Sequence, residues 1–258
     1  DTIAGFGGLD LSLTDQLVLQ GSARYTQQYR KFEGCLADSG DGTLAAAFHG
    51  AFGTPAVAGG CLTINDFFQQ VPVVKAELNE NNISWRVSLN WKPSADTLLY
   101  ANVTKGFKAG SFTNLPLILE SQANPVTQES VLGYEAGFKA SLADRRVNIT
   151  GAVFSYDYRN KQLLGYAISP IFGNLPSLVN IPKSYVRGAE LDVGVRPVSG
   201  LSINASATYL NTKVQKDPAN PIGPFGEVTS FVGNTLPDTP KWNLAVRSQY
   251  DFKLSDSF

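Results

Sequence analysis

Apolar and polar residues alternate along much of the chain, and the alternating runs come in pairs separated by very short turns. The clearest run covers residues 201–211, where odd positions are mainly apolar and even positions are mainly small and polar. Residues 83–91 and 242–252 repeat this period of two. The alternation predicts β-strands that each have one apolar face and one polar face.

The pattern predicts an all-β chain of nine strands with a marked asymmetry in its connections. The expected strands are 3–13, 17–32, 82–92, 97–109, 130–142, 146–158, 185–197, 201–214 and 241–254. Short turns fall at 14–16, 93–96, 143–144 and 198–200, and long polar connections at 33–81, 110–129, 159–183 and 215–240. Short turns on one rim and long loops on the other are typical of an antiparallel up-and-down transmembrane β-barrel. Soluble sandwiches rarely sort their loops in this way.

The polar face of these strands indicates what lies on that side of the sheet. Ser, Thr, Asn and Gly share it with isolated Arg, Asp and Glu, whereas a face open to bulk water would be dominated by Lys and Glu. This mixture suits a water-filled or plugged lumen. Bacterial single-chain barrels have an even number of strands, so nine strands do not form a closed barrel. We therefore expect residues 1–258 to form a single partial barrel domain belonging to a larger barrel.

Composition leaves the membrane assignment open and removes other classes. The mean hydropathy is −0.08, and no run of about 18 apolar residues is present to form a transmembrane helix. A membrane-spanning β-barrel is not detected by a search for apolar runs, because only alternate residues of its strands face lipid. The 21 basic and 22 acidic residues are mixed along the chain, which argues against nucleic-acid binding. The chain contains no methionine, so we expect it to be a mature or excised segment.

The two cysteines point to an oxidising compartment. Cys35 and Cys61 both lie in the first long connection and are flanked by Gly, Ser, Asp and Pro. We interpret them as a disulfide that staples an exposed loop. The alternatives are two free thiols or, more weakly, a metal pair that includes His49.

No catalytic group of residues emerges from the sequence. The single histidine argues against a histidine-rich metal site, and the Asp38–Asp41 segment lacks the later ligands of a calcium loop because Leu44 and Ala46 follow it. We therefore expect no enzymatic activity, no cofactor and no bound metal.

Four segments resemble motifs of TonB-dependent outer-membrane receptors. Tyr100–Phe112, YANVTKGFKAGSF, resembles the family's Y-x-x-x-x-K-G-F-K-x-G-x-F strand motif. Thr127–Lys139 resembles its P-E-x-x-x-x-Y-E-x-G-x-K motif, with Gln128 where the family usually has proline. Arg187–Leu191 is similar to a shortened R-x-x-G-x-E-L segment, and Leu236–Trp242 to an L-P-x-x-P element. Four motifs in the expected order make the resemblance far more specific than any one of them.

The resemblance implies a location and a function. The full protein would be a barrel of about 22 strands in the bacterial outer membrane, contacting lipid outside and an N-terminal plug domain inside. It would engage TonB and import a scarce bulky solute, above all a ferric siderophore, with cobalamin or an oligosaccharide as other cargoes. Neither the plug nor the TonB-binding segment is recognised in these residues. The polar side chains expected to face the lumen are Arg86, Glu135, Lys139, Glu190, Asp192 and Arg247.

Candidate ligand-binding residues lie in the long connections. Flat rings could stack on catechols or sugars, and amides could supply hydrogen bonds. The candidates are Phe67, Phe68, Gln69, Gln70, Phe112, Phe172, Phe225 and Phe231. The alternative is that these side chains pack against one another within the loops.

Two other functional classes remain open on the sequence. One is a passive porin or adhesin-type outer-membrane barrel. The other is a secreted soluble β-sandwich that acts as a binding module, which the turn aspartates and loop aromatics allow but the sorted loops oppose.

Overall fold

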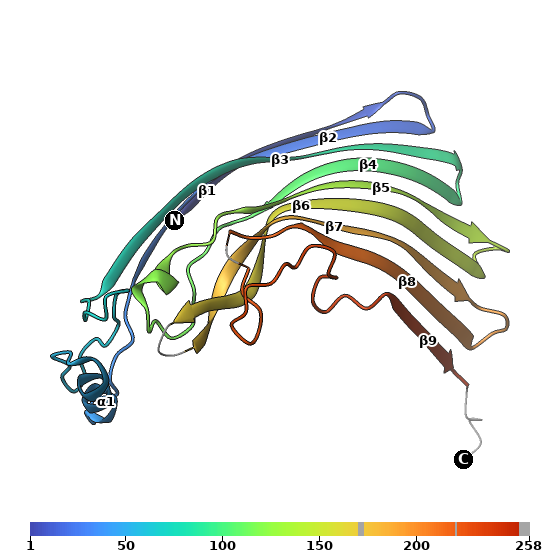
Figure 1. Ribbon diagram of the computed structural model, residues 1–258. Coiled ribbons are helices and arrows are strands. Elements are labelled where there is room, and N and C mark those ends of the chain that lie inside the picture. The colour runs from blue at the N-terminus through green and yellow to red at the C-terminus, as the bar shows by residue number, and fades with distance from the viewer. Residues whose placement is uncertain (170–172, 220, 253–258) are drawn as a thin grey trace, which may run out of the picture.

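The computed structural model describes residues 1–169, 173–219 and 221–252, and its strands form one curved sheet (Figure 1). The strands are β1 (Thr2–Ser12), β2 (Leu17–Gly34), β3 (Val74–Ser94), β4 (Thr97–Lys108), β5 (Glu129–Leu142), β6 (Val147–Ser169), β7 (Gly173–Val195), β8 (Leu201–Lys216) and β9 (Trp242–Tyr250). All neighbours are antiparallel, and the order in the 9-stranded sheet is the order in the sequence. The predicted partial up-and-down barrel is confirmed.

The two rims of the sheet differ as the pattern predicted. The short turns β1–β2, β3–β4, β5–β6 and β7–β8 all lie at one end of the arch, and the long connections lie at the other (Figure 1). Arg145 and Asp96 join two neighbouring short turns through a contact of 3.3 Å between Nε and Oδ1. The long connections bend toward the concave side of the sheet (Figure 1).

The third long connection is a correction to the sequence prediction. Residues 159–183, expected as a loop, instead extend β6 and β7 into a hairpin paired as far as Ser169 and Gly173. Asn160 and Pro182 lie between the pairs Arg159–Lys183 and Lys161–Ile181. The alternation of side chains between the two faces is interrupted at this point, because Asn160 has a φ of 51° and Pro182 has no N–H to donate. The strands continue beyond this irregularity.

Two helices also lie within connections that were expected to be irregular. Helix α1 (Thr43–Phe52) occupies the first connection, and a short 3-10 helix, η1 (Glu120–Ala123), occupies the second. The run of alanines in α1 favours helix formation. Among the described residues, no helix is both long enough and apolar enough to span a membrane.

The two faces of the sheet have opposite chemistry. Cross-strand register places Leu89, Ala101, Ala136, Val153 and Ala189 in one row on one face. Val153 is 59% exposed although it lies in the middle of a strand. Within the described residues no second sheet packs on this face, which overturns the β-sandwich alternative. This is the face that meets hydrocarbon in a barrel wall.

The buried hydrophobic cores lie mainly at the loop end of the sheet. The first contains Ala45, Phe48, Leu62, Ile64, Leu119 and Leu175, the second Val74, Leu117 and Ala123, and the third Ile181, Val214 and Leu236. The long connections therefore pack like small domains on the end of the wall.

A pair of substitutions in β8 tests the assignment of the faces. Ala207 pairs with Leu191 and Leu244 on the apolar face, whereas its neighbour Thr208 pairs with Glu190 and Asn243 on the polar face. In the full receptor, Ala207→Arg should lower the free energy of unfolding by about 2–4 kcal/mol, because a charged side chain enters lipid. Thr208→Arg should change it by less than about 1 kcal/mol, because it gains an acidic neighbour in a polar environment. Urea unfolding in lipid vesicles measures both, and equal losses would contradict the assignment.

Candidate functional site

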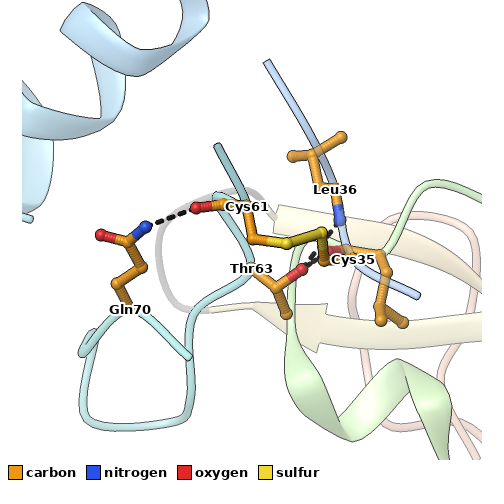
Figure 2. Close-up of a disulfide and its surroundings, with 6 residues drawn as sticks. Cys35, Leu36, Cys61, Thr63 and Gln70 are labelled. Carbon is orange, nitrogen blue, oxygen red and sulfur yellow. Dashed lines mark hydrogen bonds between the residues drawn. A yellow bond between two sulfur atoms is a disulfide. The ribbon is translucent and has the colours of Figure 1, made fainter. Parts of the chain in front are cut away.

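The disulfide predicted in the first connection is present. Cys35 and Cys61 are bonded, with their Cα atoms 5.6 Å apart and a sequence separation of 26. Figure 2 shows Thr63 beside the disulfide, where its Oγ1 accepts a hydrogen bond of 2.9 Å from the N–H of Leu36. The same hydroxyl donates to the carbonyl of Leu117, 2.7 Å away in the second connection. The stapled segment is thus also tied to a neighbouring loop.

A buried carboxylate organises the segment enclosed by the disulfide. Oδ1 of Asp38 accepts hydrogen bonds from the N–H groups of Gly40, Gly42 and Gly59 at 2.8, 3.0 and 3.1 Å. Oδ2 accepts from the N–H of Ala45 in the first turn of α1 at 3.0 Å. The bond from Gly59, supported by those from the other three amides, holds the pKa of Asp38 well below its ordinary value of 3.8. Asp38 therefore fixes the start of α1 and the chain before Cys61.

The first and second connections pack on each other and on β7. The N–H of Ile64 donates to the carbonyl of Ile118 at 3.0 Å, and the N–H of Glu120 donates to the carbonyl of Ile64 at 2.9 Å. Oε1 of Gln122 accepts from Ile118, and its Nε2 donates to the carbonyl of Pro176 in β7 at 3.3 Å. The two connections therefore form one layer above the end of the sheet.

Glu80 in β3 holds both ends of the second connection. Its Oε2 accepts from the N–H of Gly110 at 2.8 Å, and its Oε1 accepts from the N–H of Gln128 at 2.6 Å. A Cβ at Gly110 would lie 2.5 Å from the carbonyl oxygen of Val126 and 2.7 Å from Leu78. The clamp thus requires glycine at this position.

The opposite side of the second connection is held by the β6–β7 hairpin. Nε2 of Gln162 donates to the carbonyl of Ala109 at 2.8 Å. Asn180 accepts from the N–H of Thr127 at 2.9 Å and donates to its carbonyl at 3.0 Å, as a paired strand residue would. The ion pair between Lys161 and Glu129, 3.5 Å and largely shielded from solvent, strengthens the same junction.

The fourth connection is anchored separately. Asp217 accepts hydrogen bonds from the N–H of Phe231 at 2.7 Å and from the hydroxyl of Ser230 at 2.6 Å. Phe231 packs against the third core. Nδ2 of Asn174 in β7 donates to the carbonyl of Pro224 at 2.6 Å. We call the assembly of residues 35–73, 109–128, 160–182 and 217–241, as far as it is described, the outer loop layer.

The candidate ligand-binding residues fall into two groups. Phe68 stacks on Phe52 at 6.0 Å, Phe112 stacks on Phe32 at 5.3 Å, and Gln70 donates to the carbonyl of Cys61. With Phe231, these side chains take part in the packing of the outer loop layer. In contrast, Phe67 is 81% exposed, Phe225 is 94% exposed and Gln69 is also exposed. Phe172 lies outside the described residues.

The six polar residues expected to face the lumen share one face of the sheet, opposite to the apolar row. Lys139 pairs with Thr150, which pairs with Asp192, and alternation places the other members on the same face. The set is Arg86, Glu135, Lys139, Glu190, Asp192 and Arg247. Tyr156 donates its hydroxyl proton to Oε2 of Glu135 at 2.9 Å. That this face lines the lumen remains a prediction.

Several anchoring residues were missed in the sequence. Glu80, Gln162 and Asn180 lie in parts of β3, β6 and β7 that were expected to be loop, so their side chains could not be assigned partners. For Gln162 and Asn180 the only local signal was a polar residue directly beside Leu, Val or Ile, whereas Glu80 lies between two asparagines and gave no such signal.

Comparison with known proteins decides the family. The protein-family model described as "TonB dependent receptor-like, beta-barrel" matches residues 1–257. The chain belongs to the TonB-dependent receptor family. A probable TonB-dependent siderophore receptor, PiuA of Acinetobacter baumannii, is 23% identical over 181 residues, which cover 68% of this chain and 23% of that protein.

Solved structures of uptake receptors share the fold. The ferric yersiniabactin uptake receptor FyuA from Yersinia pestis superposes with a TM-score of 0.65 at 17% identity, over 96% of this chain and 30% of that one. The siderophore receptor PiuA from Acinetobacter baumannii gives 0.66 at 17%, over 96% and 31%. The ferric-catecholate import receptor Fiu from E. coli K12 gives 0.62 at 18%, over 96% and 32%. The chain thus spans about a third or less of the length of these proteins.

The family assignment fixes the setting of the outer loop layer. TonB-dependent receptors are transport receptors whose barrels lie in the bacterial outer membrane, and the nine strands described above are part of such a wall. The outer loop layer lies on the long-loop rim of this TonB-dependent receptor wall.

The Asp38 anchor gives a testable dependence on pH. Because its folded-state pKa is lowered, the carboxylate stabilises the first connection above its ordinary pKa, and this contribution is lost as the pH falls through the lower folded-state value. Hydrogen exchange should show protection of the amides of Gly40, Gly42, Ala45 and Gly59 persisting to about pH 4 and weakening below it.

The matched variants for this prediction are Asp38→Asn and Asp41→Asn. Asp41 is exposed, and its Oδ1 accepts only from the Thr43 N–H and the Ser39 hydroxyl among the described groups. Asp38→Asn should accelerate exchange of the four amides at neutral pH, whereas Asp41→Asn should leave them close to wild type. Equal exchange in the two variants would show that Asp38 is not the anchor.

Proposed function

We propose that the protein containing this chain is an outer-membrane TonB-dependent receptor that binds and actively imports a ferric siderophore, without enzymatic activity. Residues 1–258 supply nine strands of its wall and the outer loop layer. The observation that carries the proposal is the family match over residues 1–257, combined with a packed loop layer on one rim. A solute arriving from outside meets that layer first.

The related proteins support iron carriers as the cargo. FyuA is named for ferric yersiniabactin uptake, Fiu for ferric-catecholate import, and PiuA as a siderophore receptor. A copper transporter, OprC, also shares the fold with a TM-score of 0.59, and this makes copper ions a useful comparison in uptake assays.

Exposed aromatic side chains on rigid supports suit a ligand with flat rings. Phe225 follows Pro224 in a turn closed by Glu227, whose Oε2 accepts from the N–H of Phe225 at 3.0 Å. Phe67 and Gln69 lie on a turn where Oδ1 of Asn65 accepts from both of their N–H groups at 3.0 Å. Because these turns are already ordered, binding would cost little conformational entropy. The rings are available for stacking on a catechol.

The remaining partners follow from the same proposal. The polar face, with three acidic and three basic side chains in the set named above, would lie against an N-terminal plug domain supplied elsewhere in the full protein. Transport would require contact of that protein with TonB. The apolar face would contact outer-membrane lipid.

Energy dependence separates active import from a passive pore. In cells that depend on the full receptor, uptake of iron-55 delivered by a catecholate siderophore should fall to background when an uncoupler collapses the proton gradient. Deletion of TonB should have the same effect. Uptake that persists under both conditions would instead indicate a passive porin-type barrel.

The exposed rings give a second prediction. Phe67→Ala and Phe225→Ala should each weaken siderophore binding by about threefold to tenfold, because one stacking contact is lost. Val232→Ala, which trims a half-exposed apolar side chain in the same connection as Phe225, should have no measurable effect. Binding to whole cells measures all three, with cobalamin and copper ions as comparison cargoes. Preferential uptake of either comparison cargo would contradict the siderophore assignment.

A further inference from the structure

A group of basic residues lies on the apolar side of the wall, close to the long-loop rim. Arg159 of β6, Lys183 and Arg187 of β7, and Lys213 of β8 are all exposed, and we call them the basic patch. Arg159 and Lys183 are directly opposite each other in the ladder. Lys183 also pairs with Lys216 of β8.

Register shows that the basic patch is on the outward face. Arg159 and Val153 differ by an even number of positions in β6, and so do Arg187 and Ala189 in β7, so the members of each couple lie on the same face. Val153 pairs with Ala189, which places both couples on one face of the sheet. The same row continues to Tyr209 and Trp242. The basic side chains therefore share the lipid-facing side with the apolar row.

The basic patch begins where the apolar row ends. Tyr209 and Trp242 pack with ring centroids 4.9 Å apart, and such rings are typical of the level of the lipid head groups. From this level toward the long-loop rim, the outward positions of β6, β7 and β8 include the four residues of the basic patch, together with Asp157, Tyr185 and uncharged polar residues. Arg187 lies over the ring of Tyr185, with Cζ 4.5 Å from its centroid, and Nζ of Lys241 lies 5.8 Å from that of Tyr209. Long basic side chains at such a level can extend to lipid head groups.

The charges of the basic patch are not balanced by the protein. None of the ion pairs formed within the described parts of the chain includes a member of the patch. Asp157 shares the face and pairs with Tyr185. Elsewhere on the same face and rim, by contrast, Lys31 is 3.6 Å from Glu77 and Lys75 is 3.3 Å from Glu33. Like charges directly opposite in a sheet are destabilising, so an external anion would stabilise the basic patch.

We propose that the basic patch binds the phosphorylated head groups of lipids in the leaflet that surrounds the long-loop rim. The position of the basic patch favours a lipid as the ligand, because the patch continues the hydrocarbon-facing row and its cations reach the level of the head groups. The charge selects phosphate, since each basic side chain near a membrane surface attracts anionic head groups. Arginine can also bind a phosphate through two parallel hydrogen bonds. The proposal is independent of the cargo that the receptor imports.

Native mass spectrometry of the full receptor tests this directly. The probes are phosphatidic acid, which carries a phosphomonoester, and phosphatidylcholine, each added at increasing mole fraction to detergent micelles. Phosphatidic acid should bind more tightly to the wild type. Arg187→Gln with Lys213→Gln should weaken that binding by about thirtyfold. The matched control, Lys31→Gln with Lys75→Gln, removes two outward lysines from the same rim and should change binding by less than about twofold.

Further variants keep the test decisive. Arg187→Lys with Lys213→Arg preserves both charges and should bind phosphatidic acid within a few-fold of wild type. Equal weakening in the patch and control variants, or no weakening in either, would overturn the proposal. So would equal binding of phosphatidylcholine, or complete displacement of phosphatidic acid by millimolar inorganic phosphate, which would indicate a site for a free anion. Siderophore uptake is measured separately, so the result of the uptake assay does not decide whether the basic patch binds lipid.

Discussion

Backbone N–H and C=O groups cannot be left unpaired in hydrocarbon, and the pairing of each strand with the next from β1 to β9 follows from that constraint. Once the register is fixed, alternate side chains must face different surroundings. Leu89 and Val153 fall in an exposed apolar row, whereas Glu135 and Asp192 fall on the other face. The apolar row would be costly in water and is stable in lipid.

The outer loop layer obeys a different rule, because it lies at the long-loop rim and buries apolar side chains in cores of its own. Ile64 and Leu119 are buried between connections that are far apart in the sequence. Asp38 and Glu80 satisfy backbone amides at the points where the chain turns away from the sheet. The wall and the layer meet at the β6–β7 hairpin, which is both strand and loop support. Ordered supports of this kind hold exposed rings such as Phe225 in place for binding.

The sequence was sufficient for the wall and insufficient for the outer loop layer, for a physical reason. A period of two arises wherever a strand separates two media, so strands such as 201–214 were predicted within two residues of their ends. Beyond Arg159 the hairpin contacts the second and fourth connections instead of separating two media, the period of two is lost, and residues 159–183 were wrongly expected to be loop. The Cys35–Cys61 disulfide was predicted from its setting. The clamp at Glu80 depends on docking between distant segments, which no local pattern records.

The central claim is that odd and even positions of one strand meet hydrocarbon and a wet interior in turn. Spin labels placed singly at residues 203–208 of β8, in the full receptor in lipid vesicles, test it most directly through collision rates with oxygen and with a water-soluble nickel complex. The account predicts that oxygen, which concentrates in lipid, collides most with odd positions and the nickel complex with even ones. Rates that do not alternate, or that alternate in the opposite sense, would contradict it.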